Sequence, residues 1–183
     1  MNANDPRVKR TKQLIQQTFL ELMKEKGFDA ITIQDIASRS TINRSTFYAH
    51  YTDKYALLEE LTELAFEKTL PEETVQAKEF TSDVCGQLVK STYEYIVAFY
   101  KKCRFSNKSF ANQIDGKVKH LLRQMIHAIL DRSKMDCDAN IASSMISSAI
   151  YSAAYCWHEG NGSDDIKPLS DAVTSFILKG LKK

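Results

Sequence analysis

A run of hydrogen-bond donors occupies residues 44–50, and no carboxylate interrupts it. Five side chains in this run can donate hydrogen bonds: Arg44, Ser45, Thr46, Tyr48 and His50. Phe47 is the one strongly apolar residue among them, so a helix of this composition would bury Phe47 and present its other side chains to an anionic partner. An arginine at the start of such a helix can bond the O6 and N7 atoms of guanine together, which discriminates between bases by about 1–3 kcal/mol.

Two short helices are expected to carry this run. Thr32 is a candidate N-cap for the first helix, with Asp35 three residues later in a variant of the capping box. Residues 40–42 break the apolar pattern, and Asn43 is a candidate N-cap for the second helix. Two short helices joined by a tight turn, the second of them polar, are the layout of a helix-turn-helix that reads the DNA major groove. An ordinary helical hairpin with a polar exposed face would show the same pattern.

The preceding segment is expected to provide the platform for these two helices. Asp5 and Pro6 are typical of a helix start, and Gly27 stands where a left-handed residue commonly ends a helix. A helix is therefore predicted over about residues 7–26, with a buried stripe of Leu14, Ile15, Thr18, Phe19, Leu22 and Met23. The residues expected to complete this small core are Phe28, Ile31, Ile36, Ala37, Ile42, Phe47 and Tyr51.

A further helix is predicted over about residues 53–68. Thr52 and Asp53 can cap it, and Pro71 marks its end. Its predicted buried residues are Leu57, Leu58, Leu61, Leu64 and Ala65. Beyond Pro71, helices are expected from Thr81 or Ser82 to about residue 102, over 107–114, over 117–133, from Asp136 or Asp138 to about 158, and from Pro168 onward. Glycine and proline are sparse, so the fold class is predicted to be all-α.

The stretch TIQDIASRSTINRSTFYAHYTDK, residues 32–54, closely resembles the DNA-binding motif of the TetR/AcrR family of bacterial transcriptional regulators. The resemblance is dense over about residues 7–58 and includes the pair Phe47-Tyr48, Lys54, and Tyr51 where the family usually has Phe. The family usually has Gly where this chain has Thr41. If that position needs a positive φ, a β-branched residue there costs about 1 kcal/mol or more, and otherwise Thr41 lies in an ordinary region.

The resemblance implies roles for the polar residues around the motif. Tyr48, His50 and Lys54 match family positions that contact the DNA backbone, and Thr32 and Gln34 match positions that meet phosphate or flanking bases. Arg44, with Ser45 and Thr46 beside it, would reach base edges. The family architecture implies a three-helix DNA-binding domain, residues 1–53, and a larger helical bundle for ligand binding and dimerisation, residues 54–183.

The charge distribution agrees with a local contact to phosphate, and the cysteines do not suggest a metal site. The net charge is only +2, but residues 1–54 hold nine basic and six acidic residues, with four of the bases in 7–12. The spacings of Cys85, Cys103, Cys137 and Cys156 match no zinc pattern. No secretory signal peptide is found, so a cytoplasmic location with free thiols is expected.

No enzyme, cofactor or metal is predicted. His120 and His127 lie two helical turns apart, which is too far to bind one ion. Cys156 and His158 diverge on a helix, so they do not form a nucleophile and base. The uncharged stretch 139–158 has the length of a membrane span, but its many serines predict a buried or interfacial helix and no membrane partner.

The second domain is expected to hold a small-molecule site and a dimer interface. The residues suggested for the ligand pocket are Tyr93, Phe99, His127 and Trp157, although aromatic residues of a bundle are commonly plain core. Small residues line one side of the uncharged helix: Ala142, Ser148, Ala149, Ser152 and Ala153. With the last helix they resemble the four-helix bundle that joins two family subunits, and ordinary packing within one chain would use the same pattern.

These observations predict a cytoplasmic, homodimeric, TetR-like transcriptional regulator. It is expected to be a repressor that binds a palindromic double-stranded operator and is released by an unidentified small-molecule inducer. The alternative is a regulator of the same fold that acts as a co-activator or adaptor through protein contacts.

Overall fold

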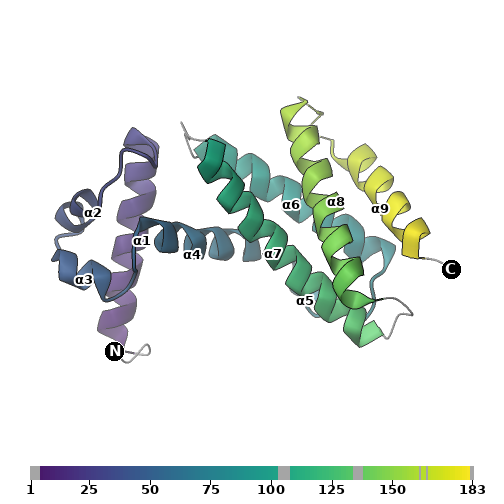
Figure 1. Ribbon diagram of the computed structural model, residues 1–183, viewed down its shortest axis with the longest axis horizontal. Coiled ribbons are helices and arrows are strands. Elements are labelled where there is room, and N and C mark those ends of the chain that lie inside the picture. Colours follow the sequence, from purple (N-terminus) through teal and green to yellow (C-terminus); the bar gives the residue numbers. More distant parts are fainter. Residues whose placement is uncertain (1–4, 103–107, 134–137, 161, 164, 182–183) are drawn as a thin grey trace. The chain divides into compact units, whose positions relative to one another are not determined.

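The computed structural model describes residues 5–102, 108–133, 138–160, 162–163 and 165–181. These residues form helices and no strand, which confirms the all-α prediction (Figure 1). The helices are α1 (Pro6–Lys26), α2 (Ile33–Arg39), α3 (Arg44–Tyr48), α4 (Lys54–Glu67), α5 (Glu72–Val75), α6 (Ser82–Lys102), α7 (Lys108–Ser133), α8 (Ala139–Glu159) and α9 (Lys167–Leu181). Cys103, Cys137 and the candidate cap Asp136 lie outside the described residues.

The chain divides into two compact units. The first unit comprises Met1–Thr62 with Tyr100–Ile114, and the second comprises Glu63–Phe99 with Asp115–Lys183. Helix α4 therefore begins in the first unit and ends in the second. The functional boundary predicted between residues 53 and 54 stays a prediction.

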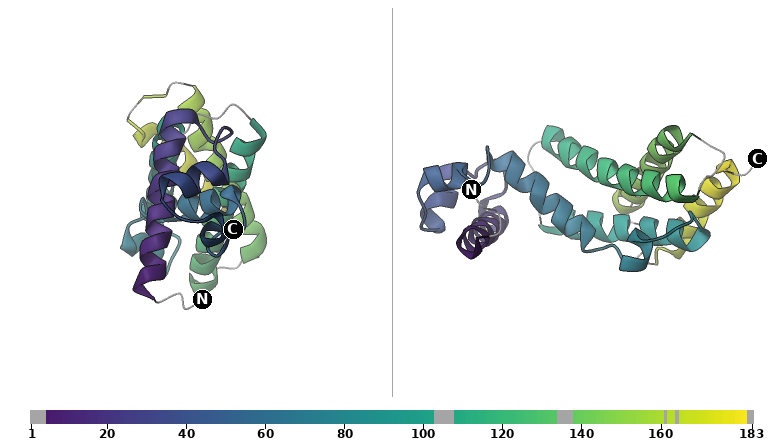
Figure 2. Two further views of the ribbon diagram at one scale, coloured as in Figure 1. Left: turned by 90° about the vertical axis from the view of Figure 1, so that its left-hand side faces the viewer. Right: turned by 90° about the horizontal axis from the view of Figure 1, so that it is seen from below.

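In the first unit, α2 packs against α1 and α3 packs against α2 (Figures 1 and 2). The Asp5 side chain caps α1 by accepting a hydrogen bond from the amide of Arg7, and Gly27 ends α1 with a φ of 74°, as predicted. The predicted stripe of α1 is buried except for Leu14, which is 42% exposed. That part of the prediction was wrong because Leu14 lies at the edge of the stripe that Ile15, Phe19 and Leu22 turn toward α2.

The small core of the first unit agrees with the prediction at nearly every position. Phe28, Ile31, Ile36, Ala37, Phe47 and Tyr51 are buried, and Ile42 is half-buried. The rings of Phe19 and Phe28 pack edge to face, with centroids 6.1 Å apart. This core holds α2 and α3 on α1.

The buried side of α4 differs from the prediction. Leu57 and Leu58 are buried, but Leu64 is 37% exposed and Ala65 is exposed. Thr62 and Phe66 are buried in their place, because a helical face repeats every three to four residues and the face that starts at Leu58 continues through them. Beyond Pro71, which is the N-cap of α5, the chain forms a short helix that the sequence analysis did not predict.

Helix α7 is continuous, whereas two helices were predicted over 107–114 and 117–133. Residue 107 lies outside the described residues, and Gly116 lies within the helix. A glycine inside a helix costs about 1 kcal/mol, which tertiary packing commonly outweighs. Ile114 and Val118 on either side of it are fully buried, and their packing keeps the helix intact through Gly116.

In the second unit, α8 packs against α9 (Figure 1). The Asp138 side chain caps α8 by accepting hydrogen bonds from the amides of Asn140 and Ile141, at 2.9 and 3.0 Å. Large apolar side chains on these two helices remain in solvent: Ile141 is 60% exposed, Met145 68% and Phe176 74%. Among the described residues, none of the helices is both long and apolar enough to cross a membrane.

Candidate nucleic-acid interface

The turn between α2 and α3 needs a residue with positive φ, and that residue is Thr41. Its φ is 54°, so the strained alternative of the sequence analysis is the one observed. The amide of Ile42 donates to the carbonyl of Ala37 at 3.0 Å, and the amide of Thr41 donates to that of Ser38 at 3.3 Å. These two bonds form a Schellman motif, in which the left-handed residue is ordinarily glycine. The turn therefore keeps the geometry of a glycine turn without a glycine.

Helix α2 begins with the predicted capping box. The Thr32 hydroxyl accepts a hydrogen bond from the Asp35 amide at 3.1 Å, and the Asp35 carboxylate accepts one from the Thr32 amide at 2.8 Å. Gln34, the other predicted contact residue on this helix, is exposed and donates to the Ser38 hydroxyl at 2.9 Å. The box fixes where α2 starts and leaves Thr32 and Gln34 at the surface.

Helix α3 buries one side chain and exposes its others. Phe47 is fully buried, and Tyr48 is 56% exposed with its ring edge to face against Phe47, at a centroid distance of 5.7 Å. Arg44 and Ser45 are exposed, and Thr46 is half-buried. Phe47 thus fixes the helix on its core while its neighbours form a polar outer surface.

Arg44 is the cation of the α2–α3 segment that makes no ion pair within the described residues. Lys26 pairs with Asp35 at 2.7 Å, and Arg39 pairs with Glu25 at 2.5 Å. The Lys26 ammonium and the two Thr32 hydrogen bonds hold the pKa of Asp35 far below its usual range. Because their neighbours already neutralise Lys26 and Arg39, Arg44 is the guanidinium left for an outside anion.

His50 is half-buried beside the end of α3. Burial lowers its pKa, and the nearby Lys12 ammonium lowers it further against the opposite effect of Glu60. The lowered pKa favours the neutral form of the imidazole. In that form it can meet a nucleic acid as a hydrogen-bond donor or acceptor.

Lys54 has a set of partners that the sequence analysis did not foresee. Its ammonium donates to the backbone carbonyls of Phe28, Asp29 and Ile31 at 3.0, 3.2 and 2.8 Å. It also lies 4.4 Å from the centroid of the Phe28 ring. An ammonium has three N–H groups, so the observed bonds use all of them.

A polar network that the sequence did not reveal joins α1 to α4 inside the first unit. The Gln16 amide donates to the Glu60 carboxylate at 2.9 Å and to the Tyr51 hydroxyl at 3.2 Å, and Lys12 pairs with Glu60 at 2.8 Å. In the sequence, Gln16 is 35 residues from Tyr51 and 44 residues from Glu60, so no local pattern connects them. The network makes the first half of α4 part of the first unit.

A hollow of about 480 Å³ lies beside the turn, lined by Ala37, Ser38, Thr41, Ile42, Asn43 and Thr46. Of these, Thr46 alone was singled out from the sequence as a contact residue. Ser38 and Asn43 were not singled out, and their polar side chains inside the motif make them further candidates. Asn43 stands at the N-cap of α3 without making a side-chain cap bond, so its amide is available to a ligand.

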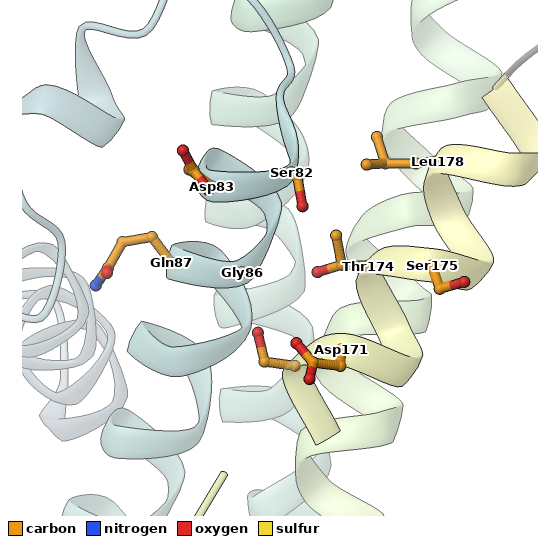
Figure 3. A pocket seen from close by; sticks show the side chains of 9 residues that line it. Ser82, Asp83, Gly86, Gln87, Asp171, Thr174, Ser175 and Leu178 are labelled. Atoms are coloured by element: carbon orange, nitrogen blue, oxygen red, sulfur yellow. The ribbon is translucent and has the colours of Figure 1, made fainter. Parts of the chain in front are cut away.

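The second unit contains a separate hollow of about 520 Å³ between the start of α6 and α9 (Figure 3). It is lined by Ser82, Asp83, Gly86, Gln87, Ser170, Asp171, Thr174, Ser175 and Leu178. Gly86 allows the two helices to approach, since a Cβ there would lie 3.1 Å from the Ser170 hydroxyl. Hydroxyls and carboxylates dominate this hollow, so its chemistry suits a polar or cationic molecule.

None of the four residues suggested for the ligand pocket lines that hollow. Tyr93 and Phe99 are half-buried on α6, and His127 is half-buried on α7. Trp157 on α8 donates from its indole nitrogen to the carbonyl of Ser163 at 3.1 Å. Its ring also covers Gly162, where a Cβ would lie only 2.4 Å from the indole nitrogen. Trp157 thus packs on the loop after α8, and the ligand role of all four stays a prediction.

Comparison with known proteins finds sequence matches to transcriptional regulators. Residues 18–61 match the family described as bacterial regulatory proteins, tetR family. The uncharacterized HTH-type transcriptional regulator YxbF of Bacillus subtilis (strain 168) is 46% identical over 56 residues. This match covers 30% of the chain and 15% of YxbF. The family match, residues 18–61, runs from within α1 into α4.

Solved structures resemble the chain over nearly its whole length. The Flavonoid-responsive Regulator FrrA superposes with a TM-score of 0.64 at 17% identity, covering 94% of this chain and 95% of FrrA. The Dihydroxyacetone kinase operon activator DhaS superposes with a TM-score of 0.54 at 18% identity, covering 93% of this chain and 96% of DhaS. At such identities the likeness establishes a shared helical fold.

Proposed function

Because residues 18–61 match the tetR family of bacterial regulatory proteins, we propose that the chain is a dimeric repressor that binds a palindromic operator. The observation that carries the proposal is the surface of α3, where Phe47 is buried while Arg44 and Tyr48 face solvent. An arginine without an ion pair can form bidentate bonds to a guanine, and an exposed tyrosine hydroxyl can donate to a phosphate oxygen.

The proposed DNA contacts are those of the α2–α3 segment. Arg44, Ser45 and Thr46 would reach base edges, and Tyr48 and neutral His50 would bond the backbone. Thr32 and Gln34 at the start of α2 would meet phosphate or flanking bases. The phosphate contact predicted for Lys54 competes with the three carbonyl bonds that its ammonium already makes.

The exposed apolar side chains of α8 and α9 support a homodimer through these helices. Ile141, Met145 and Phe176 are each at least 60% exposed, and large exposed apolar side chains are typical of an interface. The predicted small residues agree with close helix approach, since Ser148 and Ser152 are exposed as well. A two-fold dimer would carry two α3 helices for two half-sites about 34–36 Å apart on the DNA.

Release by a small molecule is the remaining part of the proposal. A ligand in the second unit releases DNA only if it binds the conformation that cannot bind the operator more tightly than the conformation that can. Helices α4, α6 and α7 each have residues in both units, so all three are covalent routes for such coupling. Tyr93, Phe99, His127 and Trp157 remain the proposed ligand residues, and a cytoplasmic location follows from a function on DNA.

The test is binding of the purified full-length chain to the intergenic DNA upstream of its own gene, measured by gel shift and footprinting. A protected palindrome is the expected result, and candidate effectors are then screened for release. If neither the free protein nor any ligand-treated sample protects a site there, the repressor proposal fails.

A co-activator or adaptor of the same fold is the second candidate function. DhaS, which has a similar fold, is named as an operon activator, and this name supports the second candidate. An adaptor would act through protein contacts and would not need α3 to bind DNA. Transcription in vitro from the upstream promoter separates the two, because a repressor lowers transcript yield when added alone and a co-activator does not.

A further inference from the structure

We propose that Lys54 is a positioning residue for DNA reading: its ammonium ties the start of α4 to the segment before α2 and so fixes both ends of the α2–turn–α3 motif. The role deepens the proposed function and rests on it. Nothing in the chain's family match assigns this role to Lys54, and the sequence alone suggested a phosphate contact instead.

The ammonium is already saturated in the free protein. Three carbonyl oxygens, those of Phe28, Asp29 and Ile31, lie within 3.2 Å of Nζ. The Phe28 ring lies beneath the charge at 4.4 Å, and Tyr55 adds a second ring at 5.9 Å. A phosphate oxygen would have to displace one of these acceptors before it could take a proton from Lys54.

The three carbonyls belong to the non-helical connection between α1 and α2, in which the side chains of Phe28 and Ile31 are buried. Helix α1 ends at Gly27, and α2 starts only after its cap at Thr32. A backbone bond from the amide of Ile31 to the carbonyl of Phe28, at 3.1 Å, lies within this connection. The ammonium gathers three carbonyls around one point, and this sets the path by which the chain approaches the capping box.

Lys54 acts on the motif from its other end as well. It is the first residue of α4, where the Asp53 side chain caps the helix by accepting bonds from the amides of Tyr55 and Ala56, both at 2.8 Å. The α2–turn–α3 motif lies between the carbonyls of residues 28–31 and this helix start. The Lys54 bonds therefore close a loop around the motif, and the orientation of Arg44 on α3 depends on that closure.

The experiment compares three full-length variants. Lys54→Met keeps the apolar stem and removes the ammonium. Lys54→Arg keeps the charge but replaces a point donor with a planar fork, which cannot aim three donors at three converging carbonyls. Lys24→Met is the matched control, because Lys24 is an exposed lysine of α1 in the same unit. Each variant is measured by amide hydrogen exchange without DNA and by binding to mixed-sequence duplex DNA over a salt series.

The positioning role predicts one pattern. Both Lys54 variants should exchange the amides of Ile31 and Ile36 roughly tenfold faster or more, since bonds to a charged donor are lost, and Lys24→Met should not. Both should weaken DNA binding without changing the slope of log K against log salt. Exchange rates equal to wild type in both Lys54 variants would overturn the proposal.

A direct phosphate contact predicts a different pattern. Lys54→Met would then flatten the salt slope by about 0.9, Lys54→Arg would bind like wild type, and exchange near residues 28–31 would not change. Hydrogen exchange needs no DNA, so it decides the positioning role even if the wild-type chain binds no DNA and the proposed function fails.

Discussion

Helix α3 of the first unit and helices α8 and α9 of the second both leave large side chains in solvent, but of opposite kinds. On α3 the exposed side chains are Arg44 and Tyr48, which carry hydrogen-bond donors. On α8 and α9 they include Met145 and Phe176, at 68% and 74% exposure, which carry none. Donors suit hydrated phosphates and base edges, whereas bare apolar side chains suit a protein partner. The difference supports the proposal of separate partners for the two units, and each proposed partner can be tested by its own substitution.

The largest expected effect comes from placing a charge on the apolar face. Phe176→Asp should weaken the free energy of dimerisation by at least about 2 kcal/mol, because the interface would have to bury a carboxylate. This raises the dimer dissociation constant roughly thirtyfold. Sedimentation velocity measures the dimer over a concentration series. Val75→Asp is the control, since it adds the same charge at an exposed apolar residue of α5. A wild-type chain that sediments as a monomer would contradict the two-half-site scheme.

The second effect tests the donor face. Arg44→Ala should lose about 1–3 kcal/mol of discrimination at one base position, measured by competition among duplexes that differ at that position. Arg39→Ala removes an arginine whose guanidinium is held by Glu25, so it should change discrimination less. Equal losses from the two variants would show that Arg44 contributes charge alone and does not read a base.

Local signals account for the parts of both units that the sequence predicted. The caps at Asp5 and Thr32 and the positive φ of Gly27 involve residues within four positions of each other, so a pattern in the sequence reveals them. Between Thr32 and Lys54, local signals predicted the two short helices, and the resemblance to a known family was needed to choose a helix-turn-helix over an ordinary helical hairpin. Its polar surface needs only short helices and one buried phenylalanine.

Long-range packing accounts for what the sequence did not predict. The carbonyls that bind Lys54 lie 23 to 26 residues away, and the Gln16–Glu60 bond joins residues 44 apart. Gly116 was a local signal for a helix end that the burial of its neighbours overrode. In the second unit no motif fixed a ligand site, so the polar hollow between α6 and α9 could not be derived from aromatic content.

A smaller effect, on the free energy of unfolding, is expected from a substitution at Thr41 in the turn between α2 and α3. Thr41→Gly should stabilise the chain by up to about 1 kcal/mol, because relief of the left-handed strain exceeds the added entropy of the unfolded state. Denaturant unfolding followed by circular dichroism measures the change. Ser38→Gly, in the helical part of α2, should instead destabilise by about 0.5 kcal/mol. A loss of stability in both variants would mean that Thr41 makes contacts that outweigh its strain.

The smallest effect concerns acid and the capping box at the start of α2. The folded pKa of Asp35 is lowered below its ordinary value of 3.8 by Lys26 and Thr32. Its contribution to stability is therefore complete above 3.8 and is lost as the pH falls through the lower folded pKa. Asp35→Asn should be less stable than wild type at neutral pH, and the difference should shrink in acid.

Lys26→Met provides the complementary variant, because it removes the largest cause of the lowered pKa. At neutral pH, the double variant should lose no more stability than the sum of the losses in the two single variants. The reason is that the two residues share one interaction. Thermal unfolding of all four proteins across an acidic pH series measures both trends. A stability difference between Asp35→Asn and wild type that stays constant as the pH falls would show that the capping amide bonds, and not the carboxylate charge, hold the start of α2.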